Sequence, residues 1–450
     1  MRTKPYDVVI IGGGSAGLAA MRTVREHTSH FVVINDGPWG TTCARTGCQP
    51  SKLLIEAANA FHARSRFGEL GLKGAQQLRV DSRRVLMRVR RERDAFVRSM
   101  VKESAALLSK AISGRAEIIG PHLISIDGKT EIAAKRIIVA TGSSPILPEP
   151  MCVLGQRLLT TDSLFELDRL PKRMAVLGQG PLGIEMAQAL ARLGVKVTAF
   201  EPAPKLAGLH DAKVSAVLAA SLRKEYAIHL GTKASLVSSG ASIVLRAGRA
   251  TLTVDAVLAA LGRKPNVEGL GLENAGLTLD AEGLPKVNRR TMQAGRSAVF
   301  FAGDVQPSSA PPVLHEARDE GRIAGLNAVA RTVTSFRRKV PLVIVFTDPN
   351  IAAIGQRFDS LESSKVDFIE ADVKRVSRSR IALTGPGLLR VAVDRTTKRL
   401  LGAELAMASG EHLAHWLALA IERGSTTDVF DRAPLYHPTF EEVLAALSPA

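Results

Sequence analysis

The amino-acid sequence predicts an α/β fold followed by a smaller α+β domain. Two observations support this fold class. An apolar strand, a glycine-rich turn and a helix-compatible segment follow one another near residue 12, and the same order recurs near residue 178. After about residue 336, shorter strand patterns at 342–346 and 388–393 precede a long helical pattern at 410–423. Alternating strands and helices are typical of a parallel sheet, whereas separate runs of each are typical of an α+β domain.

The first repeated unit has the pattern of a dinucleotide-binding βαβ motif. An apolar run at 6–11 enters the turn GGGSAG, a helical pattern follows at 18–27, and a second strand at 31–34 ends at Asn35 and Asp36. Gly12 permits the tight turn, Gly14 lets backbone N–H groups approach a pyrophosphate, and Gly17 allows close packing of the helix on the strand. The helix N-terminus favours the negative charge of a phosphate.

The second unit repeats this design. A strand at 174–177 leads into GQGPLG, with Gly178, Gly180 and Gly183 at the three glycine positions, and a later strand at 195–200 ends at Glu201. From Gly12 to the polar residue that ends the second strand is 23 positions, and the spacing from Gly178 to Glu201 is the same. One such turn alone is compatible with an ordinary glycine-rich loop. Two copies at matching places favour two Rossmann-like dinucleotide-binding domains.

Three further apolar strands fit the two nucleotide domains. The segments 137–142 and 256–263 each run into a turn, and they contain Thr141, Gly142 and Gly262. The segment 298–304 ends at the carboxylate of Asp304. By itself this aspartate is more typical of a plain strand-to-turn junction than of a binding site.

The composition excludes several classes of protein. Hydrophobic residues make up 46% and charged residues 23%, as in an ordinary globular protein, and no apolar run has the length of a membrane helix. The strand pattern begins by Asp7, which leaves no room for a signal peptide. Three cysteines exclude a disulfide scaffold and indicate a reducing compartment, so we expect a cytoplasmic protein.

The chain is basic, with 60 Lys and Arg against 43 Asp and Glu and a net charge of +17. Such a charge is compatible with nucleic acid, an anionic membrane or an acidic protein as partner. Part of the excess lies at 79–102, where Leu86, Val89, Phe96, Val97 and Met100 fall at helical spacing. We interpret this stretch as an amphipathic helix with a solvated basic face. Because aromatic residues for base stacking are only 4%, we expect neither nucleic acid nor a membrane as partner.

The segment GTTCARTGCQPSK at 40–52 carries the strongest chemical signal. Cys43 and Cys48 lie five positions apart, just before a helical pattern that starts at Leu53. A helix N-terminus and nearby cations favour the thiolate form of cysteine. The alternatives are buried structural thiols or half of a zinc site. The only other cysteine is Cys152, so we expect no metal site and favour a redox-active disulfide.

A family resemblance rests on seven motifs that occur in order along the chain: GGGSAG, TTCxxxGCxPSK, ATGSSP, GQGPLGIE, GRKPN, FFAGD and HPTxxE. The chain resembles the class I pyridine nucleotide-disulfide oxidoreductases, flavoproteins that include dihydrolipoamide dehydrogenase, glutathione reductase and mercuric reductase. The resemblance implies that residues 1–147 and 263–336 form an FAD-binding domain, 148–262 an NAD-binding domain, and 337–450 a dimerisation domain.

The resemblance also implies the role of each site residue. Cys48 would be the charge-transfer thiol against the flavin, and Cys43 the interchange thiol that reacts with substrate. Asp304 would bind the ribitol chain of FAD, and Lys52 and Glu185 would form an ion pair beside the reactive end of the flavin. The residues expected to contact the cofactors are Gly12, Gly14, Ser15, Gly17, Asn35, Asp36, Lys52, Thr141, Gly142, Asp304, Gly178, Gly180, Gly183, Glu201 and Gly262.

The C-terminal motif supplies an acid–base candidate. Thiol–disulfide exchange needs a group that takes and returns a proton, and imidazole suits this task near neutral pH. By the resemblance His437 is that group, Glu442 orients its ring, and the pair reaches the cysteines of the other subunit in a homodimer. Taken alone, the motif is more typical of a surface histidine, and it is the cysteine pair upstream that favours the acid–base role.

Several positions depart from the family pattern. Asn35 stands where the family usually has an acidic residue, and Thr41 where it usually has a second glycine. Ala44 and Arg45 lie between the cysteines in place of an apolar residue and an asparagine, and Tyr436 replaces the alanine that usually precedes the histidine. These differences concern the identity of the substrate more than the reaction class.

Within the family, elimination favours dihydrolipoamide dehydrogenase with FAD and NAD. No cysteine follows Cys152, so the extra redox pair of mercuric and large thioredoxin reductases is not in this sequence. Glu201 at the ribose position would repel the 2′-phosphate of NADP. The expected substrate is a small dithiol or disulfide, including a lipoyl group on an acidic carrier domain. The alternatives are an NADH-dependent reductase of another small disulfide or electron acceptor, and a basic FAD-containing protein that binds nucleic acid or a membrane surface.

Overall fold

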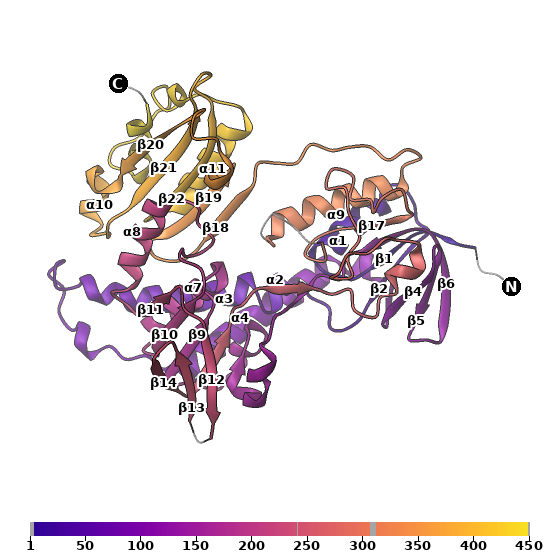
Figure 1. The fold of residues 1–450 in the computed structure, drawn as a ribbon, viewed down its shortest axis with the longest axis horizontal. Helices are drawn as coiled ribbons and strands as arrows, with labels where there is room; N and C mark the ends of the chain where they lie inside the picture. The colour runs from indigo at the N-terminus through magenta and orange to yellow at the C-terminus, as the bar shows by residue number, and fades with distance from the viewer. Residues whose placement is uncertain (1–3, 241, 307–311, 449–450) are drawn as a thin grey trace. The chain divides into compact units, whose positions relative to one another are not determined.

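The computed structural model describes residues 4–240, 242–306 and 312–448. The chain forms two compact units, each assembled from three segments (Figure 1). Unit 1 contains Met1–Pro50, Arg90–Pro145 and Arg263–Arg338, and therefore the first glycine-rich turn. Unit 2 contains Ser51–Val89, Ile146–Gly262 and Lys339–Ala450, and therefore the second turn.

Unit 1 is built on a sheet whose central strands are parallel. These strands lie in the order β3 (Ala111–Ser113), β2 (Phe31–Asn35), β1 (Tyr6–Ile11), β6 (Thr130–Val139) and β17 (Val299–Phe301). The strands β4 (Ala116–Gly120) and β5 (Leu123–Ile126) extend the sheet in antiparallel fashion from β6. Val8, Val9 and Ile10 are fully buried, as expected for a parallel strand that is covered on both faces.

Two helices of unit 1 pack so closely that backbone atoms of one lie next to backbone atoms of the other. They are α1 (Ser15–Arg25) and α9 (Leu314–Val329), which lie side by side in Figure 1. A Cβ atom on Gly321 would lie 2.2 Å from the carbonyl oxygen of Ala16, and one on Gly325 would lie 3.1 Å from that of Ala20. Two glycines one turn apart therefore allow α9 to approach α1 this closely.

The nucleotide-binding part of unit 2 repeats the architecture. Its parallel sheet has the order β11 (Ala227–Leu230), β10 (Lys196–Glu201), β9 (Arg173–Leu177), β15 (Ala256–Ala259) and β8 (Leu158–Leu159). The helices α7 (Pro181–Arg192) and α8 (Ala212–Leu222) belong to this part, as does an antiparallel sheet of β12 (Ala234–Ser239), β13 (Ile243–Ala247) and β14 (Ala250–Val254). Met174, Val176 and Ile184 are fully buried in its core.

The C-terminal part of unit 2 is α+β. Its antiparallel sheet has the order β18 (Leu342–Val345), β19 (Asn350–Gly355), β22 (Leu400–Met407), β21 (Leu388–Asp394) and β20 (Val366–Asp372). The helix α11 (Gly410–Glu422) buries Leu413 and Leu417 in the same hydrophobic core as this sheet. The predicted fold class, two dinucleotide-binding folds and an α+β domain, is thus confirmed.

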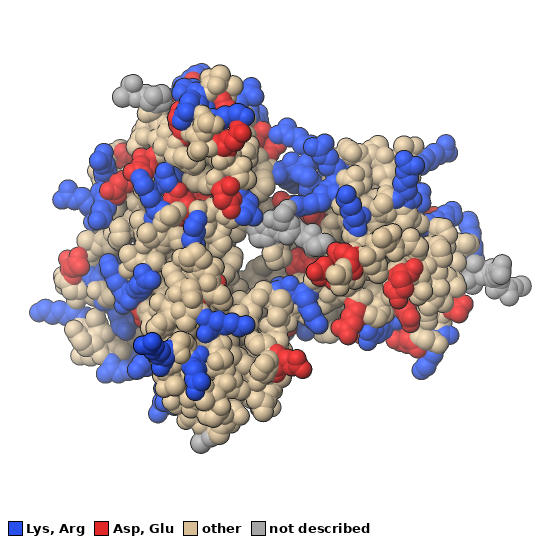
Figure 2. Space-filling view, viewed as in Figure 1, with Lys and Arg blue, Asp and Glu red and all other residues tan. Residues whose placement is uncertain are grey.

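The basic stretch predicted as one amphipathic helix is α4 (Ser82–Glu103). Leu86 and Val89 are buried, as the spacing predicts, whereas Phe96 is 43% exposed. Basic side chains are scattered over the face of the molecule seen in Figure 2 and are mixed with acidic ones.

Within residues 4–240, 242–306 and 312–448, no helix combines the length and apolar character that a membrane crossing requires.

Candidate active site

The glycine at the start of each fingerprint turn cannot be replaced without a backbone collision. Gly12 has a φ of +104°, and a Cβ there would lie 2.3 Å from the carbonyl oxygen of Ala140. Gly178 has a φ of +89°, and a Cβ there would lie 2.3 Å from the oxygen of Ala260. Each turn thus crosses directly over the end of a neighbouring strand, where only glycine fits.

The last glycine of each fingerprint packs against its own turn. A Cβ on Gly17 would lie 2.0 Å from the carbonyl oxygen of Gly12, and one on Gly183 would lie 2.1 Å from that of Gly178. The close approach that the sequence suggested between helix and strand is therefore made chiefly between the helix and the turn that precedes it.

The middle glycines leave both helix N-termini open. Gly14 is the N-cap of α1 and Gly180 that of α7, so neither helix has an N-cap side chain to bond its first N–H groups. A Cβ on either glycine would meet no atom within 4 Å. Both turns therefore fit a phosphate group that approaches the first N–H groups of the helix. Ser15 is the first residue of α1.

The polar residue that ends the second strand of each unit binds the glycine-rich turn. The Oδ1 atom of Asn35 accepts a hydrogen bond of 2.9 Å from the N–H of Gly13. Glu201 accepts one of 2.6 Å from the N–H of Gln179, and its other oxygen accepts from Ala203 at 2.9 Å. In both units, the residue 23 positions after the first glycine of the turn thus accepts a hydrogen bond from the N–H that follows this glycine. These residues were predicted to bind the ribose, and their bonds to the turns were not predicted.

Asp36 follows Asn35 and is exposed, without the bond to the turn that Asn35 makes. Gly142 and Gly262 follow the strands β6 and β15 and adopt positive φ angles of +70° and +95°. In unit 1, Thr141 donates a 2.7 Å bond from Oγ1 to the carbonyl oxygen of Asn266, whose side chain donates back to the Thr141 oxygen at 2.9 Å. The motifs ATGSSP and GRKPN are thereby joined.

Asp304 lies beside two polar residues of these same motifs. The hydroxyl of Ser143 donates to its carboxylate at 3.3 Å, and Arg263 donates to the Ser143 hydroxyl at 2.8 Å. Burial raises the pKa of Asp304, and the positive charge of Arg263 opposes this effect. Ser143 and Arg263 lie in the motifs ATGSSP and GRKPN but were not predicted as site residues, because their chain separation from Asp304 hides the contact.

The two cysteines occupy neighbouring short elements. Cys43 lies in α2 (Thr42–Arg45) and is half-buried, whereas Cys48 is the first residue of α3 (Cys48–His62) and is exposed. A Cβ on Gly47 would lie 3.2 Å from the Cα of Cys43, so the chain turns back tightly between the cysteines. The helix begins five residues before the predicted Leu53, because Pro50 is tolerated in the first helical turn, where its missing N–H is not needed.

An ion pair lies one helical turn after Cys48. The Nζ of Lys52 donates to both oxygens of Glu185 at 2.8 Å, and the Glu185 side chain is only 5% exposed. Phe346 completes the cluster, since its N–H donates to Glu185 at 2.9 Å and its ring lies 4.6 Å from the Lys52 ammonium. The contribution of Phe346 was not predicted, because nothing in its local sequence indicates it.

A second contact joins α3, which carries Lys52, to α7, which carries Glu185. Seven residues further along each helix, Arg192 of α7 donates to Oδ1 of Asn59 in α3 at 2.6 Å. Arg192 is almost fully buried and also donates to both oxygens of Glu225, at 2.6 and 2.8 Å. The two helices therefore run parallel, and their contacts recur after two turns.

His437 and Glu442 form a hydrogen-bonded pair. The Nδ1 atom of His437 lies 2.8 Å from Oε1 of Glu442, and the other carboxylate oxygen accepts from the N–H of Thr439 at 3.1 Å. These bonds lower the pKa of Glu442, the bond from His437 most strongly. Thr439 and Glu442 also form a capping box at the start of the 3₁₀ helix Phe440–Leu447, which the spacing T-x-x-E could have indicated.

Among the described residues, no three side chains of His, Cys, Asp or Glu are grouped so that they could hold a metal ion. The cysteine pair and the first fingerprint belong to unit 1, whereas Lys52, Glu185, the second fingerprint and the His437–Glu442 pair belong to unit 2.

Two dinucleotide folds, a cysteine pair and a terminal histidine–glutamate pair together define a thiol redox enzyme. Residues 6–321 match the family described as "Pyridine nucleotide-disulphide oxidoreductase", and residues 340–447 match its dimerisation domain. The chain belongs to this family. It is therefore an FAD-dependent disulfide oxidoreductase that also binds a nicotinamide dinucleotide.

Similar proteins are found over the full length of the chain. A dihydrolipoyl dehydrogenase of Thermus scotoductus is 32% identical over 98% of this chain and 96% of its own, and one of Trypanosoma brucei brucei is 29% identical over 98% and 95%. Among solved structures, LpdA from Mycobacterium tuberculosis has a TM-score of 0.85 at 26% identity, covering 98% of both chains. The HOCl-induced flavoprotein disulfide reductase RclA from Escherichia coli has a TM-score of 0.83 at 25% identity, also covering 98% of both chains.

Proposed function

We propose that this protein is a dihydrolipoamide dehydrogenase that passes electrons from a dithiol to NAD through Cys43, Cys48 and FAD. The observation that carries this proposal is the His437–Glu442 pair, because a dithiol substrate must lose a proton before it can attack a disulfide. The similarity to two dihydrolipoyl dehydrogenases at 29% and 32% identity supports the choice of substrate. On its cysteine usage we propose a cytoplasmic location.

The protein's own residues divide the work as follows. Nδ1 of His437 is bonded to Glu442, so Nε2 is the nitrogen that takes the substrate proton. The substrate thiolate attacks Cys43, the Cys43–Cys48 bond breaks, and Cys48 leaves as a thiolate at the N-terminus of α3. The second substrate thiol then closes the substrate disulfide and leaves the enzyme dithiol. When bound, FAD supplies the two-electron link from the thiols to the nicotinamide.

We propose that the active unit is a homodimer in which His437 of one subunit serves the cysteines of the other. The match of residues 340–447 to a dimerisation domain supports this arrangement. The FAD site would be formed by the first fingerprint with Ser143, Arg263 and Asp304, and the NAD site by the second fingerprint with Glu201.

The proposed function is tested by steady-state turnover of the purified holoenzyme. We expect reduction of NAD by dihydrolipoamide, and oxidation of NADH by lipoamide, to exceed turnover with glutathione disulfide. A second candidate is an NADH-dependent reductase of another small disulfide or acceptor. Two observations favour this candidate. One is the similarity in structure to the flavoprotein disulfide reductase RclA, with a TM-score of 0.83. The other is Tyr436, which is 81% exposed and stands beside His437 in place of the usual alanine. Rapid turnover of another acceptor, with none of lipoamide, would establish it.

We expect a preference for NAD(H) over NADP(H). The carboxylate of Glu201 can accept a further bond from a free 2′-hydroxyl, and it would repel a 2′-phosphate. Lys205 is the nearby cation, but its Nζ donates to the carbonyl oxygen of His210 at 2.5 Å. One charge-assisted hydrogen bond predicts selectivity of about tenfold or more in kcat/KM. Comparable kcat/KM values for the two cofactors would contradict the assignment, and Glu201→Gln should reduce the preference.

We propose that the basic face of α4 steers an acidic carrier domain that bears the lipoyl group. Exposed cations recur along this helix at helical spacing, at Arg84, Arg88, Arg91, Arg98 and Lys102. Because salt screens such steering, kcat/KM for a carrier-bound lipoyl group should fall between low and physiological salt. Turnover of free lipoamide should change little. Equal salt dependence of the two substrates would refute this role.

A further inference from the structure

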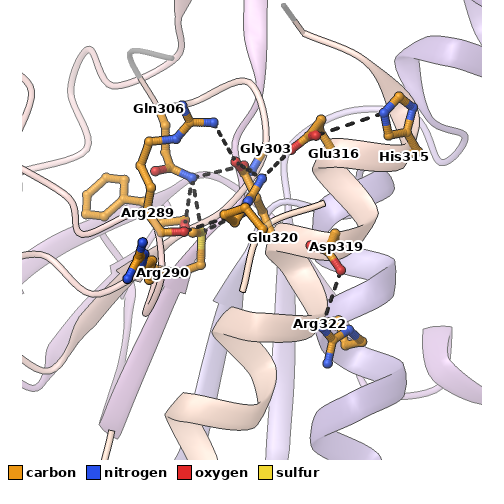
Figure 3. A network of polar contacts seen from close by, with 12 residues as sticks. Arg289, Arg290, Gly303, Gln306, His315, Glu316, Asp319, Glu320 and Arg322 are labelled. Atoms are coloured by element: carbon orange, nitrogen blue, oxygen red, sulfur yellow. Dashed lines mark hydrogen bonds and ion pairs between the residues drawn. The ribbon is translucent and has the colours of Figure 1, made fainter. Parts of the chain in front are cut away.

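The turn that carries Asp304 is held by a buried carboxylate that comes from a helix. This turn follows β17, and its residue Gly303 directly precedes Asp304. Oε2 of Glu320 accepts a 2.9 Å bond from the N–H of Gly303 and a 3.0 Å bond from the side-chain amide of Gln306. Figure 3 shows the Glu320 carboxylate directed at both residues. Glu320 is only 5% exposed, so this contact is shielded from water.

Arginines neutralise this buried carboxylate. The other oxygen of Glu320 lies 3.0 Å from the guanidinium of Arg338 and 3.8 Å from that of Arg289. Arg338 also pairs with Glu316, one helical turn before Glu320. Burial raises the pKa of Glu320, the charges of Arg338 and Arg289 lower it, and the charge of Glu316 raises it. A buried carboxylate with such partners is costly to disrupt, since the remaining charges would lose their counter-ions.

The helix that carries Glu320 also packs against the first fingerprint helix. The next residue, Gly321, is where α9 approaches the carbonyl oxygen of Ala16 in α1. Gly303 belongs to the same packing, because a Cβ there would lie 2.9 Å from the Cβ of Ala16. Adjacent residues of α9 therefore contact both the fingerprint helix and the turn of Asp304.

We infer that Glu320 is a positioning residue for FAD, which sets the turn of Asp304 at a fixed distance from the pyrophosphate-binding turn. The inference rests on the proposed binding of FAD at these two turns. It assigns no contact with FAD to Glu320, which acts through the Gly303 N–H. Loss of its charge should release the turn and weaken FAD binding, whatever disulfide the enzyme reduces.

The first test measures FAD affinity of the reconstituted full-length protein by flavin fluorescence, in the absence of substrate. In Glu320→Gln, a neutral oxygen accepts more weakly from Gly303, and an amide donor faces the Arg338 guanidinium. We expect the Kd for FAD to rise about tenfold or more. Glu316→Gln is the matched control, because Glu316 also pairs with Arg338, whereas the Gly303 N–H donates to Glu320. The Kd of this variant for FAD should equal that of the wild type. An unchanged Kd in Glu320→Gln would overturn the inference.

The second test measures how the rate of FAD release depends on pH. This dependence would not shift if Glu320 had only a structural role. In Arg338→Met the pKa of Glu320 should rise further, so its carboxylate becomes protonated at a higher pH than in the wild type. Protonation removes the charge that holds the Gly303 N–H, so FAD release should accelerate as the pH falls, beginning at a higher pH than in the wild type. Glu320→Gln has no carboxylate and should lack this step.

A negative result in these two tests can be distinguished from a failure of the proposed function. If Glu320→Gln yields no folded protein by circular dichroism, the profile of Arg338→Met decides the matter alone, and a profile like that of the wild type would overturn the inference. If the wild-type protein bound no FAD, the proposed cofactor site would be wrong. If it bound FAD but did not turn over lipoamide, only the proposed substrate would be wrong.

Discussion

Cys43→Ser and Cys48→Ser are both expected to abolish turnover, yet to differ in their absorption spectra. Cys43→Ser retains the Cys48 thiol at the first residue of α3, where a helix N-terminus favours a thiolate. A thiolate beside oxidised flavin should give a long-wavelength charge-transfer band. Cys48→Ser removes this thiolate, so the band should be absent. Spectra of the two purified holoproteins, with turnover of dihydrolipoamide and NAD, measure both effects.

The third cysteine provides the matched control for this experiment. Cys152 is exposed, and its sulfur lies 3.6 Å from the carbonyl oxygen of Pro148. Cys152→Ser should keep the spectrum and turnover of the wild type. If Cys48→Ser alone showed the charge-transfer band, the roles of Cys43 and Cys48 would have to be exchanged. A band in neither variant would mean that neither thiol lies against the flavin.

His437→Gln is expected to slow reaction with the dithiol by roughly 10²–10⁴-fold, the usual effect of losing an acid–base group. The variant keeps both cysteines and both fingerprints, so reduction of the flavin by NADH should be much less affected. Stopped-flow measurement of the two half-reactions separates these effects. Glu442→Gln should cause a smaller loss, since it weakens the bond that holds the His437 ring but leaves the imidazole.

The control for His437 is another histidine of the same unit. His415 lies on α11, and its ring bonds the backbone oxygen of Glu411 at 2.7 Å. His415→Gln should therefore leave both half-reactions unchanged. Equal slowing of the dithiol and NADH half-reactions in His437→Gln would indicate general damage to the enzyme. A dithiol half-reaction at the wild-type rate would exclude His437 as the proton acceptor.

Patterns within short segments were sufficient to predict much of this protein. The two fingerprints, the cysteine pair and the terminal histidine motif each lie within a few residues. In the fingerprints, local backbone geometry dictates where glycine must stand. Gly12 and Gly178 illustrate this point, because their positive φ angles and the carbonyl groups beneath them accept no other residue. The helices and strands that were predicted, such as 6–11 and 410–423, were read from apolar periodicity, although α3 begins five residues earlier than predicted.

Apart from the Lys52–Glu185 ion pair, which the family resemblance implied, contacts between distant segments were decided only by the tertiary structure. Ser143 meets Asp304 across 161 positions of sequence, and Phe346 meets Glu185 across the same number. Glu320 lies in an ordinary helical segment, and only the packing of α9 brings its carboxylate to the N–H of Gly303. The sequence by itself determined which chemical groups are present and which local turns hold them. Their partners depend on how helices and sheets pack, and that packing satisfies many buried charges and backbone groups at once, which no local pattern encodes.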